Sequence, residues 1–219
     1  MQVARNHGQW RWTLLLAVGC LAACGSDTGP TPPPGGGGGG GADSTHPFVQ
    51  PTGTAFALPA GVTVEGKMFG SGPTGACAGL DPVSTSLDFV AVCMTLHNAT
   101  DADTTVVLPA GLVLIAKDTE VQNGTQVVPI SIRIAPGSDT TIVYSLFCVN
   151  QHRLPSSEQD EFAFGPVSDN AGLREIITLV KDKDVTTSDA ADVIQWAIWE
   201  VSDGGGLTAD TRDQLTALP

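Results

Sequence analysis

The segment Val128-Pro-Ile-Ser-Ile-Arg-Ile134 places an apolar side chain at every second position. Successive side chains of a strand point to opposite faces of its sheet, so this period predicts a strand with one buried and one solvated face. The segments 87–96 and 142–149 are apolar at nearly every position, which predicts strands buried on both faces. Residues 54–150 therefore predict an antiparallel β-sandwich of the Ig-like type.

The hydrophobic period lengthens to that of a helix further along the chain. Between residues 171 and 183, apolar side chains recur on one helical face. Residues 189–202 predict a second helix with Ser188 as its N-cap, and Thr208 caps a short third one. We therefore expect an α+β chain, in which two or three helices within residues 151–219 pack on the sandwich.

The first 23 residues have the pattern of an export signal. Arg5 and Arg11 precede residues 13–23, an apolar stretch of 11 residues without an acid. A membrane-spanning helix needs about 20 apolar residues, so this stretch is too short to be one. We predict a signal peptide over residues 1–23.

The residues after this stretch predict a lipid anchor. Leu21-Ala-Ala-Cys24-Gly25 resembles the lipobox of bacterial lipoproteins, which implies cleavage before Cys24 and acylation of its sulfur. Cys20 is a weaker alternative cleavage point. Gly25 in place of Asp favours the outer membrane over the plasma membrane. Residues 24–53 are rich in Pro and Gly and predict a disordered tether that holds the domain outside the cytoplasm, in the cell envelope.

Composition restricts the partners and cofactors. The chain has 10 Lys and Arg against 23 Asp and Glu, a net charge of −13. Binding of nucleic acid through a general basic surface is therefore not expected, because phosphate neutralisation needs clustered cations. The sequence contains no metal-ligand spacing or phosphate-binding loop, so we expect no metal and no cofactor.

Three cysteines fall in the predicted domain: Cys77, Cys93 and Cys148. In an exported protein an odd number leaves at least one thiol without an internal partner. A disulfide between Cys77 and Cys93 would leave Cys148 free, but a pairing of Cys148 with either of the others stays open.

Two short motifs carry a resemblance to a known family. Phe147-Cys-Val149, followed by Ile194-Gln-x-x-Ile-Trp199, is similar to the motifs of the thioester domains of bacterial surface adhesins. In those domains an aromatic-Cys-apolar motif precedes an apolar-Gln-x-x-apolar-Trp motif. The similarity covers residues 144–208.

The resemblance implies a function. Cys148 and Gln195 would form an internal thioester with loss of ammonia, and Phe147 and Trp199 would cover it. An amine of an extracellular partner would then attack the carbonyl of Gln195 and remain bound to it. The expected protein is a surface adhesion module, not an enzyme.

Two other functions fit the same residues. In the first, the chain is a non-covalent structural or ligand-binding module, with Cys148 in the core or in a disulfide and Gln195 as an ordinary helix amide. In the second, Cys148 and His152, with Asn150 nearby, act as a cysteine hydrolase.

Overall fold

The computed structural model describes residues 49–83 and 89–219. The predicted signal peptide, the predicted lipidation site Cys24 and nearly all of the predicted tether lie outside these residues. The described elements, in chain order, are β1 (Gly53–Ala55), β2 (Val62–Val64), β3 (Met68–Gly70), β4 (Val90–Asn98), β5 (Thr104–Leu108), β6 (Leu112–Ala116), β7 (Gly124–Thr125), β8 (Ile130–Ile134), β9 (Asp139–Cys148), β10 (Glu161–Ser168), α1 (Ala171–Val180), α2 (Ser188–Ser202) and α3 (Ala209–Ala217).

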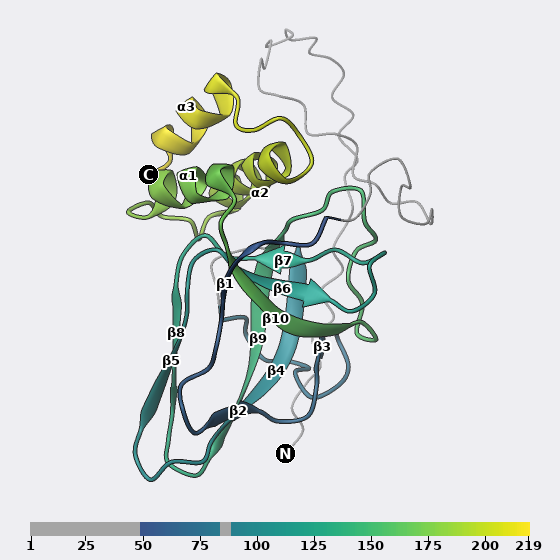
Figure 1. Cartoon of the computed structure of the whole chain (residues 1–219), viewed down its shortest axis with the longest axis vertical. Coiled ribbons are helices and arrows are strands. Elements are labelled where there is room, and N and C mark those ends of the chain that lie inside the picture. The colour runs from purple at the N-terminus through teal and green to yellow at the C-terminus, as the bar shows by residue number, and fades with distance from the viewer. Residues whose placement is uncertain (1–48, 84–88) are drawn as a thin grey trace, which may run out of the picture. The chain divides into compact units, whose positions relative to one another are not determined.

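Six antiparallel strands close into a barrel. Their order is β10-β3-β4-β9-β7-β6, and β6 pairs again with β10 (Figure 1). The longest pairing joins β4 to β9, from Val90 opposite Leu146 to His97 opposite Asp139. The predicted antiparallel α+β class is confirmed. However, the strands form a closed barrel instead of the two open sheets of an Ig-like sandwich, because β10 bonds to both β3 and β6.

The boundary between sheet and helices does not lie at the predicted residue 150, because β10 follows it. This strand lies within the predicted helical part, residues 151–219, and also pairs with β1. Its register shifts between Phe164 and Val167, where the sequence has Gly165 and Pro166. Gly and Pro are typical of turns, so this strand lacks an uninterrupted β-branched pattern. The helices begin only at Ala171.

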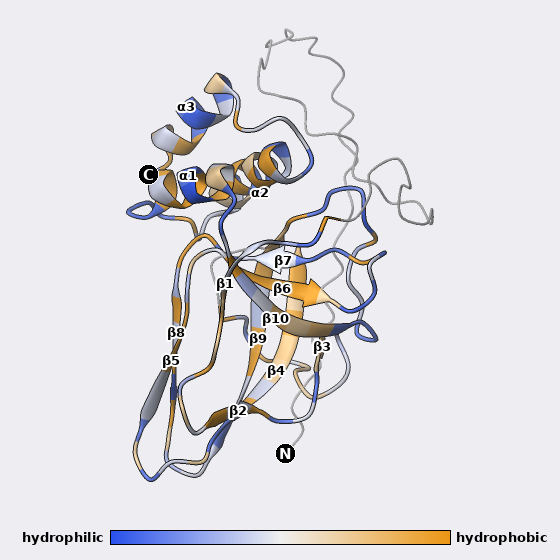
Figure 2. Cartoon of the chain, in the orientation of Figure 1, coloured by the Kyte–Doolittle hydropathy of each residue, from blue (hydrophilic) through white to orange (hydrophobic). Residues whose placement is uncertain are grey.

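A separate ribbon of β5 and β8 covers part of the barrel core. β8 alternates as its sequence predicts, since Ile132 and Ile134 are buried while Ser131 and Arg133 are exposed. The buried residues of both strands join the hydrophobic cluster of the barrel. Figure 2 shows apolar residues along β4, β6 and β9, around the centre of the barrel.

A second hydrophobic cluster holds the three helices against the barrel. α1 and α3 begin after Asn170 and Thr208, and each cap side chain accepts a hydrogen bond from a main-chain N–H of the first turn. Thr187 caps α2, so Ser188, the predicted cap, is instead the first residue of the helix. None of the helices in the described part of the chain is long and apolar enough to cross a membrane.

Candidate functional site at Cys148

The structure separates the three cysteines into a disulfide and a thiol. Cys77, in the loop after β3, is bonded to Cys93 in the middle of β4. Cys148 is free and buried. The candidate thioester cysteine is therefore available for other chemistry.

Cys148 is the last residue of β9, where the barrel meets the helices. Its side chain belongs to the barrel cluster and is 3% exposed. The preceding residue, Phe147, belongs to the helix cluster, as expected from the alternation of a strand. β9 thus places the thiol inside the barrel and the aromatic ring under the helices.

Gln195 of α2 binds the main chain of Cys148 at two points. The Cys148 N–H donates to Gln195 Oε1 at 2.8 Å, and Gln195 Nε2 donates to the Cys148 carbonyl at 2.9 Å. Gln195 is only 2% exposed. The two predicted site residues are therefore in direct contact.

The position at which β4 begins explains why Gln195 can bind the main chain of Cys148. β4 begins at Val90, which pairs with Leu146, so Cys148 extends two residues beyond this pairing. Buried main-chain groups need hydrogen-bond partners, and the amide of Gln195 supplies both a donor and an acceptor there.

The sulfur of Cys148 has a different partner. Its Sγ donates to Oε1 of Gln122 at 3.0 Å, and Gln122 is 7% exposed. Gln122 does not stand out in the sequence, because the composition of Gln122-Asn-Gly-Thr125 is typical of an exposed turn. In the structure this segment is buried and leads into β7.

Burial raises the pKa of the Cys148 thiol from its ordinary value near 9 to about 12. A reactive cysteine nucleophile normally has a lowered pKa. The site therefore stabilises the neutral thiol over the thiolate, which is the more reactive nucleophile. Asn150, which the cysteine-hydrolase hypothesis names together with Cys148 and His152, accepts a hydrogen bond from the Asn123 N–H through its Oδ1 at 3.2 Å.

Phe147 and Trp199, the aromatic residues expected to cover the thioester, are both withdrawn from solvent to different extents. Phe147 is fully buried and stacks on Phe89, with ring centroids 6.0 Å apart. Trp199, one turn after Gln195, is partly buried against the barrel cluster. Its Nε1 is buried and has no hydrogen-bond partner among the described residues. Trp196, by contrast, is 38% exposed, and its Nε1 donates to Glu200.

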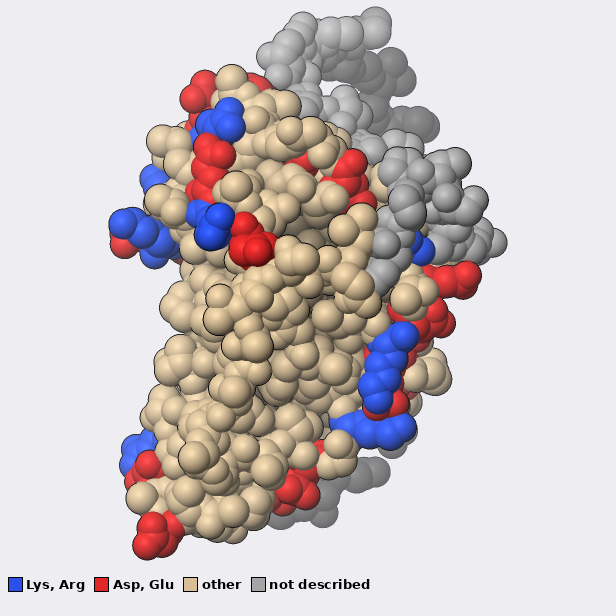
Figure 3. Space-filling view, viewed as in Figure 1, with Lys and Arg blue, Asp and Glu red and all other residues tan. Residues whose placement is uncertain are grey.

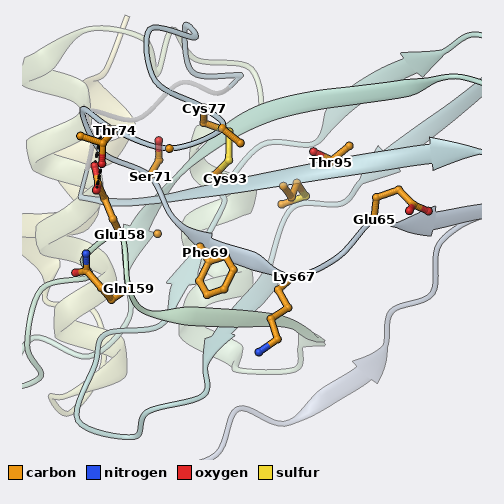
Figure 4. Close-up of a pocket in the computed structure, with 14 residues that line it drawn as sticks. Glu65, Lys67, Phe69, Ser71, Thr74, Cys77, Cys93, Thr95, Glu158 and Gln159 are labelled. Carbon is orange, nitrogen blue, oxygen red and sulfur yellow. Dashed lines mark hydrogen bonds between the residues drawn. A yellow bond between two sulfur atoms is a disulfide. The ribbon is translucent and has the colours of Figure 1, made fainter.

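Another cavity lies away from this site, over β3 and β4. It measures about 340 Å³, and its lining includes Phe69, the disulfide and Glu158, but neither Cys148 nor Gln195 (Figure 4). The Thr74 side chain and N–H donate to Glu158, and these hydrogen bonds lower the pKa of its carboxyl group. The carboxylate is therefore already held by the protein.

A smaller cavity of about 150 Å³ adjoins the candidate site. It lies between the barrel end and α2, and its lining includes Val149, which follows Cys148, and Ile198, one turn after Gln195. Its lining contains no charged side chain. On the face drawn in Figure 3, the charged residues also gather towards the ends and one side and leave the middle uncharged.

The described residues contain no group of three or more His, Cys, Asp or Glu that could hold a metal ion. The chain matches no family model, no curated protein and no solved structure. The candidate site is thus defined by its geometry: a buried thiol, a buried amide bound to the same residue, and a second amide at the sulfur.

Proposed function

We propose that the chain is a lipoprotein of the cell envelope, anchored through Cys24 in the outer membrane, that binds an extracellular partner covalently through a Cys148–Gln195 thioester. The supporting observation is the pair of hydrogen bonds by which the Gln195 amide binds the main chain of Cys148. These bonds join residues 47 positions apart and hold an amide beside the residue that bears the free thiol.

The proposed chemistry balances without a cofactor. Cys148 Sγ attacks Cδ of Gln195; the S–Cδ bond forms, the Cδ–Nε2 bond breaks, and the thiol proton leaves with ammonia. An amine of the partner then attacks Cδ and displaces the Cys148 thiolate. A proton passes from the amine to the sulfur, and the partner stays joined to Gln195 by an amide bond.

The burial of both residues would protect a thioester from hydrolysis. A thioester is hydrolysed if water reaches it, and Cys148 and Gln195 are 3% and 2% exposed. Formation requires the Gln195 amide to leave the Cys148 main chain and turn its carbon towards Sγ.

Mass spectrometry of the intact protein tests the proposal. The wild type should lack the mass of one ammonia, and methylamine should add its own mass to that species, with the adduct on Gln195. Cys148→Ser and Gln195→Ala should each show the unmodified mass. A wild type of full mass with an alkylatable Cys148 thiol contradicts the thioester.

A non-covalent envelope module is the second candidate. Both polar atoms of the Gln195 amide already have partners on the Cys148 main chain, which is the expected state of a purely structural glutamine. In this case the wild type keeps its full mass, and Gln195 contributes to stability alone.

A further inference from the structure

The Cys148 sulfur lies against an amide other than that of Gln195. Cys148 Sγ donates to Gln122 Oε1 at 3.0 Å, and both side chains are buried. The thiol is therefore held in one orientation by a neutral acceptor.

The fold places Gln122 at this sulfur through β7. Gly124 pairs directly with Cys148, and Gln122, two residues earlier, is the diagonal neighbour of Cys148 across the strands. The Gln122 N–H donates to the Leu154 carbonyl at 2.9 Å, which fixes the backbone of this residue.

The packing of β7 against β9 requires a glycine at position 124, opposite Cys148. A Cβ at Gly124 would lie 2.7 Å from Cβ of Leu146, closer than real Cβ contacts allow. The position across from Cys148 therefore carries no side chain. The side chain that binds the sulfur comes instead from Gln122, two residues earlier.

We propose that Gln122 is a positioning residue for the Cys148 sulfur and that it promotes formation of the thioester. This inference rests on the proposed function. With the S–H bond directed at Gln122 Oε1, the lone pairs of the sulfur are directed elsewhere and can attack the Gln195 carbon. Without this acceptor the thiol samples several rotamers, and fewer of them permit attack.

Gln122→Met is the test variant, because Met has a similar length and shape but lacks a strong acceptor. Gln126→Met is the matched control. Gln126 is also a fully buried glutamine four residues away, but its Nε2 donates to the Ser145 carbonyl and not to the sulfur. Each full-length protein is refolded, and the loss of ammonia is followed with time by mass spectrometry. The rate of methylamine addition to the completed thioester is measured separately.

Gln122→Met should slow thioester formation by about tenfold, the effect of one hydrogen bond, whereas Gln126→Met should form it at the wild-type rate. Both variants should be less stable than the wild type. Equal rates of formation in Gln122→Met and the wild type, or equal slowing in both variants, would overturn the positioning role while leaving the thioester in place.

A wild type that never loses ammonia refutes the proposed function and, with it, the promoting role of Gln122. Alkylation of Cys148, followed at the peptide level, then decides whether Gln122 holds the sulfur at all. Gln122→Met should be alkylated several times faster than the wild type and Gln126→Met. Equal rates in the three proteins overturn the positioning of the sulfur as well.

Discussion

The side-chain amide of Gln195 binds the main chain of Cys148 where a neighbouring strand would otherwise pair with it. Its amide makes the two hydrogen bonds, of 2.8 and 2.9 Å, that a paired strand would make with the Cys148 main chain. The contact joins α2 to the end of β9, and therefore the helices to the barrel. This arrangement gives Gln195 a structural role as long as its amide stays bound to the Cys148 main chain.

Gln195→Ala should destabilise the fold by about 1–3 kcal/mol, because it leaves a buried N–H and a buried carbonyl of Cys148 without partners. The free energy of unfolding in urea measures the effect. A Cys148→Ser background prevents any contribution from a thioester. Gln159→Ala is the control, since Gln159 is exposed and should change stability by less than about 0.5 kcal/mol. Equal losses in the two variants would contradict the role of Gln195 at the strand edge.

Removal of the disulfide should also destabilise the domain. Cys77 and Cys93 are 16 residues apart, and closing a loop of this length stabilises a fold by about 3 kcal/mol in the chain-entropy estimate. The double variant Cys77→Ser and Cys93→Ser should lose this amount in urea unfolding. A reducing agent should lower the stability of the wild type similarly but leave the double variant unchanged.

The sequence predicted those parts of the fold that depend on local patterns. The alternation in 128–134 and the helical period near α1 agree with the structure, because one buried face imposes each period. β10 was missed, since Gly165 and Pro166 resemble a turn and only pairing with distant strands makes this segment a strand. Closure of the barrel depends on those same long-range pairings.

The candidate site was predictable to the same extent. Cys148 and Gln195 were selected from motifs, and the structure places them in contact. Gln122 could not be found in this way, because Gln-Asn-Gly has the composition of an exposed turn. Its burial follows from the pairing of β7 with β9, which no local pattern indicates.

Gly124→Ala should destabilise the barrel by about 1–3 kcal/mol through overpacking. The new Cβ would lie 2.7 Å from Cβ of Leu146 and 3.2 Å from a methyl group of Val90, both of which are fully buried. Thermal unfolding followed by circular dichroism measures the change. Gly205→Ala is the matched control, because a Cβ there has no neighbour within 4 Å. A melting temperature lowered equally in both variants would show that the close approach at Gly124 is unimportant.

The thiol of Cys148 should make stability depend on pH in the alkaline range. Burial raises the pKa of this thiol to about 12 in the folded protein, against about 9 when it is exposed. Above pH 9 the unfolded thiol ionises while the folded thiol stays protonated, so ionisation favours the unfolded chain. The stability associated with the neutral thiol is therefore fully present below pH 9 and is lost as the pH rises towards 12.

The comparison of the thiol form of the protein with Cys148→Ala isolates this effect. Other alkaline titrations, such as that of buried Tyr144, occur in both proteins and cancel in the difference. Between pH 9 and 11 the free energy of unfolding of the thiol form should fall relative to Cys148→Ala, by at most about 1.4 kcal/mol for each pH unit. Parallel curves over this range would mean that the folded thiol ionises as readily as the unfolded one, and that water reaches the site.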